Sequence, residues 1–238
     1  MSGQSAMDAS CGSDGLSACN SVEDVLNNGF AVTFVRSSAT VIAGAKPAAV
    51  FSFCPKGVLG AAGGYFRRAV GYHEGLVRAK LRSVLRAYAR ELPRHGIRLE
   101  VVGARAGRVQ LLVWRGELVS RVLADPDRSD FLQRLGHGLD AGELMRSLRR
   151  RLCEYHLGLR SEFPHEIGLV LGYPLEDVIG FMSGKEETCR GLWRVYGDPA
   201  RARRRFEFLR RIESRCRNNF ASGISTWQIG RASCRERV

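Results

Sequence analysis

The sequence predicts a mixed α/β (α+β) fold: a single domain with a small, few-stranded sheet and a largely helical C-terminal half. Two strand-like runs, residues 97–102 and 109–114, flank a short glycine-containing loop at 103–107, which is typical of a hairpin. Apolar residues recur at helical spacing over 76–92 and 141–159. With 45% hydrophobic and 26% charged residues, the chain has the composition of an ordinary globular protein.

The first half of the chain predicts one short helix and two strands before the amphipathic helix. Ser21-Val-Glu-Asp is a capping-box pattern that opens a helix over residues 21–27. Residues 30–35 and 48–53 are rich in β-branched and aromatic side chains, so each predicts a short strand. The helix over 76–92 is expected to end at Pro93.

The second half is predicted to be helical around one further strand. After the hairpin, helical patterns cover residues 117–123, 129–135 and 141–159. Residues 191–196 predict a strand. Asp198 and Pro199 then supply the N-cap and the first position of a long helix.

The ends of the chain are expected to contribute nothing to the core. Residues 1–20 are rich in Ser, Gly, Asp and Asn and predict a disordered leader, and the domain is expected to span 21–220. Residues 221–238 are predicted to be a disordered tail. Within it, residues 229–238 match the in-frame translation of a common sequencing-adapter oligonucleotide, so we leave them out of the fold.

Residues 163–184, which we call the corner, combine two short apolar segments, each with a proline at its start and a glycine at its end. Pro164 and Pro174 are predicted to open two helices, and Gly172 and Gly184 to close them. The expected buried face of the second helix is Leu175, Val178, Ile179 and Met182. Gly168 and Gly180 would lie inside the helices, which predicts close backbone approach there.

Two functional interpretations of the corner fail on its residues. A DNA-reading second helix would present basic and amide side chains, whereas this one presents Glu176 and Asp177. A zinc-protease helix needs a second His four residues after His165, where Leu169 stands. A packing role remains, in which His165 is a hydrogen-bonded structural residue or lines a site.

Three segments carry a family resemblance. "FPHEIGLVLGYPLEDVIGFM" at 163–182, "LWRVYGD" at 192–198 and "AGAKPAAVFSF" at 43–53 resemble the domain of unknown function 3793 family. The resemblance covers about residues 21–220 and implies an uncharacterised bacterial cytoplasmic protein, mainly of anaerobes, with no assigned activity. Where the family has a His-Cys pair, this chain has Ser37-Ser38, which argues against a metal or thiol site there.

Lys46 is the most distinctive candidate for ligand binding. The 37 basic residues include only four Lys, a bias toward Arg that a GC-rich genome produces, yet Lys46 stands among small and apolar residues. A Lys there could bind an anion or act as a desolvated amine; the alternative is a stem covering apolar surface with its ammonium in water. The full set of ligand-binding candidates is Lys46, His165, Glu166, Trp193 and Tyr196.

The formal net charge of +13 raises the question of a polyanionic partner. Arginines recur every four residues on the outer face of the helix over 76–92, at Arg78, Arg82, Arg86 and Arg90. They would suit a nucleic acid, although a solvated face is the simpler interpretation. No membrane span is expected, because charged residues and prolines interrupt the most apolar window, 41–66.

The leading hypothesis is a non-catalytic cytoplasmic binding or accessory protein, with a pocket or partner surface near Lys46 and the His165 corner. The first alternative is an enzyme or cofactor-binding protein of redox or iron metabolism that uses His165, Cys189 and Lys46. The second is a nucleic-acid binder through the Arg-rich helices. No catalytic residue, cofactor or metal can be assigned, because no catalytic triad, phosphate-binding loop or dinucleotide fingerprint is present.

Overall fold

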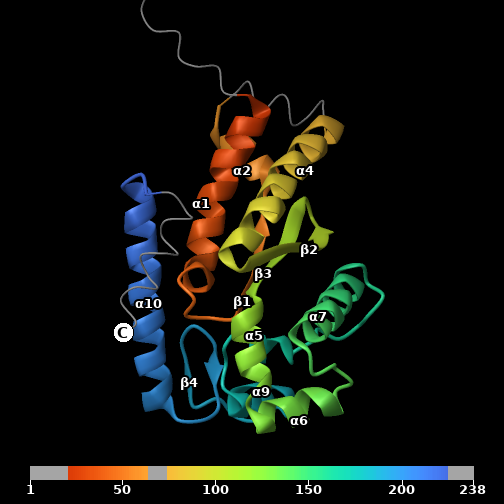
Figure 1. The fold of residues 1–238 in the computed structure, drawn as a ribbon, viewed down its shortest axis with the longest axis vertical. Helices are drawn as coiled ribbons and strands as arrows, with labels where there is room; N and C mark the ends of the chain where they lie inside the picture. The colour runs from red at the N-terminus through yellow and green to blue at the C-terminus, as the bar shows by residue number, and fades with distance from the viewer. Residues whose placement is uncertain (1–20, 64–73, 225–238) are drawn as a thin grey trace, which may run out of the picture.

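The computed structural model describes residues 21–63 and 74–224 and confirms the mixed α/β fold class (Figure 1). The predicted leader and residues 225–238 of the predicted tail lie outside this part of the chain. In chain order, the elements are α1 (Val22–Ile42), β1 (Ala48–Phe53), α2 (Pro55–Ala61), α4 (Glu74–Glu91), a 3-10 turn (Leu92–His95), β2 (Ile97–Arg105), β3 (Arg108–Arg115), α5 (Gly116–Leu123), α6 (Pro126–Arg134), α7 (Ala141–His156), α8 (Ile167–Val170), α9 (Leu175–Met182), β4 (Cys189–Arg190), β5 (Arg194–Val195) and α10 (Pro199–Ala221).

The central sheet has three antiparallel strands in the order β1-β3-β2. The predicted hairpin is present, but its strands are longer and its turn is only Ala106-Gly107, both with positive φ. This is the two-residue turn whose twist matches that of the flanking strands. A bulge between Val101 and Gly103 shifts the register within β2.

Both faces of the sheet are buried, which explains the continuous apolar run in β3. Because side chains alternate along a strand, Leu111 and Val113 face one core while Leu112 and Trp114 face the other. The first core lies under α1, α2 and α4. The second lies against α5, α7 and α8. Figure 1 shows α10 lying alongside α1.

The N-terminal helix corrects the sequence prediction. The capping box of Ser21 and Asp24 is present, but α1 continues for 21 residues, so the strand predicted at 30–35 is wrong. Phe30 and Phe34, four residues apart, stack with their ring centroids 5.9 Å apart. The second half of α1 is buried almost all round, and in such a setting tertiary packing overrides β-propensity.

The end of α1 is tied to the sheet by Arg115. Its guanidinium donates to the carbonyl oxygens of Val41 and Ile42 at 2.6 and 2.7 Å and to that of His95 at 2.9 Å. A cation there interacts favourably with the last carbonyl groups of the helix, at the negative end of its dipole. This anchor fixes the start of the loop that carries Lys46.

The corner consists of two short helices joined by a left-handed glycine, with two departures from the prediction. Gly172 has φ of +83° between α8 and α9, as expected for a helix stop. However, α8 begins only at Ile167, so Pro164 lies in the turn before it rather than at its first position. On α9, Val178 is buried, but Ile179 and Met182 are 37% and 43% exposed, so the expected apolar face was only half right.

The face of α9 that is buried differs from the predicted one for a physical reason. Asp177 and Gly180 face the β4-β5 hairpin: the Asp177 carboxylate bonds to it, and a Cβ added at Gly180 would lie 2.5 Å from the Tyr196 side chain. Glycine is therefore required at 180 for close approach, as it is at Gly168, where an added Cβ would meet Val178 at 2.8 Å. The hairpin itself corrects the single strand predicted at 191–196, because the chain reverses between β4 and β5.

Gly180→Ala is expected to destabilise the protein by about 1–3 kcal/mol, because the methyl group cannot be accommodated without moving α9 from the hairpin. Gly75→Ala is the matched control, since nothing lies within 4 Å of an added Cβ in that helix and Ala favours the helical backbone. Urea unfolding measures both. Equal stability of the two variants would contradict the packing at Gly180.

Beyond the hairpin, α10 begins as predicted. Asp198 caps it by accepting from the backbone N–H groups of Ala200 and Arg201, and Pro199 occupies its first turn. The side chains that α10 buries are Ala202, Phe206, Leu209 and Cys216. In the described residues, no helix combines the length and apolar character needed to cross a membrane.

Candidate functional site

A pocket of about 690 Å³ lies where the corner, the loop after α1, α5, α6 and the first turns of α10 meet. We call it the corner pocket. It is lined by Gly44, Ala45, Pro47, Gly172, Pro174 and Trp193, and by side chains of α5, α6 and α10. Its volume falls in the range of small-molecule sites.

Arginines from three helices line this pocket. They are Arg121 of α5, Arg128 of α6, and Arg201, Arg204 and Arg205 of α10. Arg121 pairs with Glu117, and Arg128 pairs with Asp125 at 3.2 Å. Within the described chain, the side chains of Arg201 and Arg204 form no ion pair closer than 4 Å. These two guanidinium groups are therefore available to a ligand.

The fifth arginine has a structural role as well. Arg205 donates to the carbonyl oxygen of Ala45 at 2.7 Å, and its guanidinium lies 5.2 Å from the ring centre of Phe208. Burial lowers the pKa of Arg205. The contact with Ala45 joins α10 to the loop after α1, so it holds two walls of the corner pocket together.

Two of the three acidic residues on the pocket wall are already occupied by protein donors. Asp177 is 3% exposed and accepts from Trp193 Nε1 at 2.7 Å and from the backbone N–H groups of Tyr196 and Gly197 at 2.7 and 3.0 Å. Asp198 is the cap of α10, and its hydrogen bonds to the backbone of that helix lower its pKa. With Glu176 as the third, five basic groups face three acidic ones.

Trp193 is the predicted ligand residue that lines the corner pocket. It is 7% exposed and stacks on Tyr173, with ring centroids 4.9 Å apart, while Phe206 meets it edge-on at 4.5 Å. Its indole N–H is committed to Asp177. Trp193 therefore forms a rigid part of the pocket wall, and its indole N–H is not free to bind a ligand.

Lys46 lies beside the corner pocket, between the lining residues Ala45 and Pro47. Its ammonium is 5.7 Å from the ring centre of Tyr173. Burial lowers the pKa of Lys46; Glu213 opposes this shift and the positive charge of Arg205 adds to it. The structure thus gives Lys46 a desolvated amine directly behind the pocket wall.

His165 and Tyr196 lie in a different place, in a row of rings between α7 and the hairpin. His165 contacts Phe163 and Phe181, at centroid distances of 5.4 and 4.7 Å, and Phe181 in turn contacts Tyr196 at 6.4 Å. Neither His165 nor Tyr196 lines the corner pocket. Cys189 packs separately, against the apolar cluster around Trp193.

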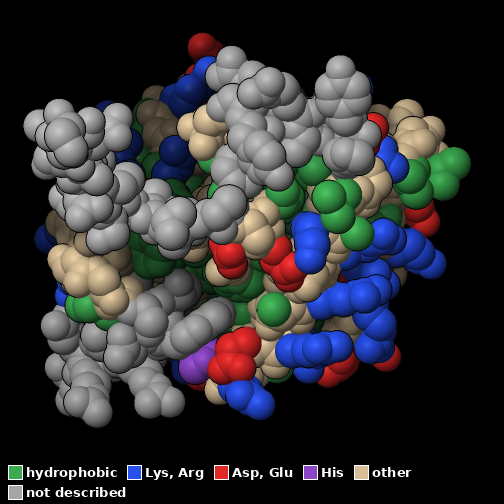
Figure 2. Space-filling model, turned by 90° about the horizontal axis from the view of Figure 1, so that it is seen from above, with side chains coloured by type: hydrophobic (Ala, Val, Ile, Leu, Met, Phe, Trp, Pro, Cys, Tyr) green, Lys and Arg blue, Asp and Glu red, His purple; other side chains and the backbone are tan. Residues whose placement is uncertain are grey.

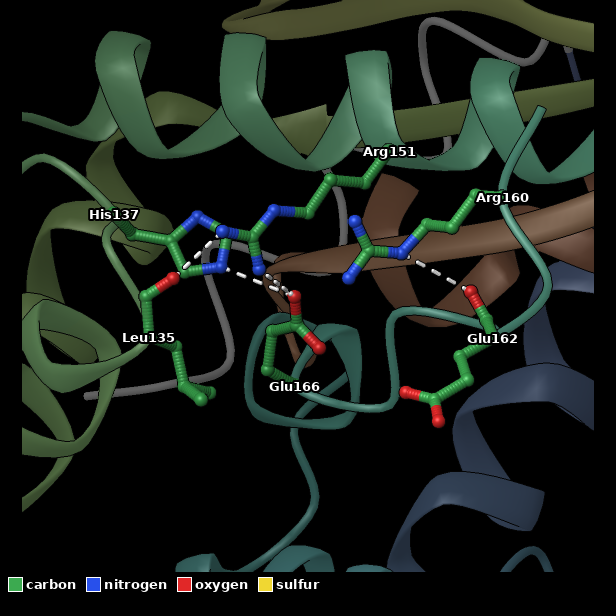
Figure 3. Close-up of polar contacts among 6 residues, drawn as sticks. All are labelled: Leu135, His137, Arg151, Arg160, Glu162 and Glu166. Carbon is green, nitrogen blue, oxygen red and sulfur yellow. Dashed lines mark hydrogen bonds and ion pairs between the residues drawn. The ribbon is translucent and has the colours of Figure 1, made fainter.

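Glu166 is held in a buried ion pair on the other side of the corner (Figure 3). Arg151 donates to its Oε1 at 2.6 Å and also to the carbonyl oxygen of Leu135 at 2.6 Å, while His137 Nε2 lies 3.1 Å from the same Oε1. Burial by itself would raise the pKa of Glu166, but hydrogen bonds from His137, from the backbone and from Arg151, with the Arg151 charge, lower it to about 2. The group fastens the corner to α7 and the α6–α7 loop.

The five predicted residues therefore do not form one site. Trp193 lines the pocket and Lys46 adjoins it, whereas His165, Glu166 and Tyr196 lie elsewhere in the corner. The convergence of the five arginines and the roles of Asp177 and Arg151 were not predicted from the sequence. The run of Arg at 201–205 was a visible signal, but its helical spacing gave no sign of which side chains share a cavity with α5 and α6.

Within the residues that the structure describes, no three His, Cys, Asp or Glu side chains come together as metal ligands. Of the four described cysteines, Cys54, Cys153 and Cys189 are free thiols, and Cys216 donates from its buried Sγ to the carbonyl oxygen of Ala39 at 3.8 Å.

One comparison with known proteins identifies a relationship. A family model described as "Protein of unknown function (DUF3793)" matches residues 34–229, from the middle of α1 to beyond α10. Neither the curated proteins nor the solved structures contain a match to the chain.

Proposed function

Because the chain belongs to the DUF3793 family of proteins of unknown function, we propose its role from its own geometry: it is a binding protein that holds an anionic organic ligand in the corner pocket. The observation that carries this proposal is the convergence of Arg121 and Arg128 with Arg201, Arg204 and Arg205 around one cavity. Guanidinium groups bind carboxylates and phosphates through paired hydrogen bonds.

The distribution of charge supports an anion with more than one acidic group. Basic side chains reach the cavity from α5 and α6 as well as from α10, so a ligand can be held at both ends. Besides the arginines and the three acidic residues, the lining is apolar or small, including Pro47, Val122 and Pro174. Such a site suits an organic molecule of moderate size.

The same lining favours binding over catalysis. Among the described residues that form it, there is no His, Cys, Lys, Ser, Thr or Tyr to act as a nucleophile or as an acid–base group near neutral pH. Of the three carboxylates in the lining, Asp177 and Asp198 are committed to structural hydrogen bonds, so Glu176 is the one that remains. We therefore propose a non-catalytic binding or accessory role in the cytoplasm, with Lys46 adding positive charge behind the wall.

The experiment is isothermal titration calorimetry of the full chain with pyrophosphate, citrate and ATP as probes. At least one is expected to bind, and Arg201→Ala/Arg204→Ala is expected to weaken it at least tenfold, because each charge-assisted hydrogen bond is worth about 1.5–3 kcal/mol. The control is Arg203→Ala/Arg210→Ala, which removes the same charge from exposed positions of α10 outside the pocket. No binding of any probe, or equal loss in both variants, would refute the proposal.

A further inference from the structure

The outer face of α4 carries a row of arginines that the corner pocket does not use. Arg78, Arg82, Arg86 and Arg90 follow at four-residue steps and are all exposed. Each step advances the row by about 6 Å, so it is about 18 Å long. Figure 2, which views the molecule from above, shows Lys and Arg side chains gathered on its right, the side on which α4 lies in Figure 1.

Three of these arginines lack the acidic partners found elsewhere in the protein. Arg78 pairs with Glu74 at 3.1 Å, but in the described chain Arg82, Arg86 and Arg90, which we call the arginine ridge, form no ion pair. Several arginines of other helices and turns pair with an acid three or four residues away, as in Arg94–Glu91, Arg121–Glu117, Arg128–Asp125 and Arg150–Glu154, although Arg201 and Arg204 of α10 do not. Like charges at four-residue spacing destabilise a helix, and an anionic partner would remove that repulsion.

The residues between the arginines narrow the choice of partner. Ala79, Ser83, Ala87 and Ala89 are exposed and small, so a flat anionic surface can approach the helix closely. Tyr88 packs inward against Phe30 and Phe34, which leaves no aromatic side chain on this face to stack on a single-stranded base. Apart from Leu76 near its start, α4 exposes no large apolar residue that could insert into a membrane.

We propose that the arginine ridge binds the phosphate backbone of double-stranded DNA without reading its sequence. The face contains no Asn or Gln, the side chains that pair with adenine, and guanidinium groups bind phosphate oxygens through paired hydrogen bonds. The major groove of B-form DNA is about 12 Å wide and admits a helix, whereas that of A-form RNA is too narrow for side chains to read. This surface is separate from the corner pocket and does not depend on it.

The test is fluorescence anisotropy of a labelled duplex of about two helical turns with the full chain at several salt concentrations. Three phosphate contacts account for about a 40-fold loss of affinity between 50 and 200 mM salt. The slope of the logarithm of the binding constant against the logarithm of the salt concentration, which we call the salt slope, measures the number of phosphate contacts. Arg82→Gln/Arg86→Gln/Arg90→Gln is expected to lower the magnitude of the salt slope by about 3 and to weaken binding at low salt at least tenfold. The corresponding lysine triple variant is expected to retain binding, because phosphate contact needs the charge rather than the planar guanidinium.

The control is Arg203→Gln/Arg210→Gln/Arg211→Gln, which removes three exposed charges from α10 and is expected to leave the slope nearly unchanged. If the ridge triple variant unfolds, Arg86→Gln alone should lower the slope by about 1. If the ridge and control variants lost affinity for the duplex equally, the proposal would be overturned, because net charge alone would then account for the binding. Equal or tighter binding of duplex RNA, of single-stranded DNA or of phosphatidylserine vesicles would overturn it as well.

Discussion

Glu166→Ala is expected to lower the free energy of unfolding by about 3–5 kcal/mol. Glu166 is 4% exposed, and its loss leaves the half-buried Arg151 and the buried His137 without their carboxylate partner. The desolvation cost of the Arg151 guanidinium is then opposed only by its hydrogen bond to the carbonyl oxygen of Leu135, without the attraction of the carboxylate. The corner would also lose its attachment to α7.

Glu162→Ala is the control, because Glu162 is exposed and only its backbone carbonyl accepts a hydrogen bond, from Arg160 (Figure 3). It is expected to change stability by about 0.5 kcal/mol or less. Urea unfolding at neutral pH measures both variants. A Glu166→Ala protein as stable as the Glu162→Ala protein would contradict the structural role of the ion pair.

The Glu166 carboxyl group is expected to make the stability of the protein depend on pH. Its pKa is lowered from 4.5 to about 2 in the folded protein, so the folded state favours the ionised carboxylate. Its stabilising contribution is complete above the unfolded value of 4.5 and is lost as the pH falls towards 2. Wild-type stability should therefore decrease more steeply over this interval than that of Glu166→Gln, which has no carboxyl group to protonate there. Parallel pH profiles would contradict the lowered pKa.

Asp177→Ala is expected to destabilise the protein by about 3 kcal/mol or more, because it removes the acceptor of one buried and two half-buried donors, and each donor left unsatisfied costs about 1–3 kcal/mol. The donors are Trp193 Nε1 and the backbone N–H groups of Tyr196 and Gly197. All three belong to the hairpin and the turn that form one wall of the corner pocket. The variant should also lose anion binding.

Asp177→Asn separates the contribution of the indole from that of the backbone. The amide oxygen can still accept from Tyr196 and Gly197, but the amide nitrogen then faces the donor of Trp193. Asp177→Asn should therefore cost less in a Trp193→Phe background, which lacks that donor, than in the wild type. Urea unfolding of the four proteins gives the coupling, and additive effects would contradict the hydrogen bond.

The sequence correctly predicted those features of the fold that depend only on a few neighbouring residues. The capping box at Ser21, the Asp198-Pro199 start of α10 and the left-handed stop at Gly172 each depend on a few neighbouring residues. The extent of α1 could not be predicted in the same way. Its Phe30 to Val35 run favours a strand on its own, and its helical state follows from burial against β1, α4 and α10.

The candidate site depends on contacts that are distant in the sequence. Arg121 and Arg201 are 80 positions apart, and Ala45 and Arg205 are joined by a hydrogen bond across 160. Helical spacing shows which side chains share a face of one helix but not which faces of different helices meet. For this reason Glu166, singled out as a ligand residue, lies in a buried ion pair, and the five arginines that line the cavity were not among the predicted ligand residues.

Hydrogen–deuterium exchange of the full chain, with and without the tightest-binding of the three anion probes, tests the corner pocket most directly. Slower exchange on binding is predicted in residues 116–134 of α5 and α6 and in residues 198–208 of α10, with little change in α4. Protection of α4 alone, or unchanged exchange in both of the predicted segments under saturating anion, would contradict the assignment of the pocket as the ligand site.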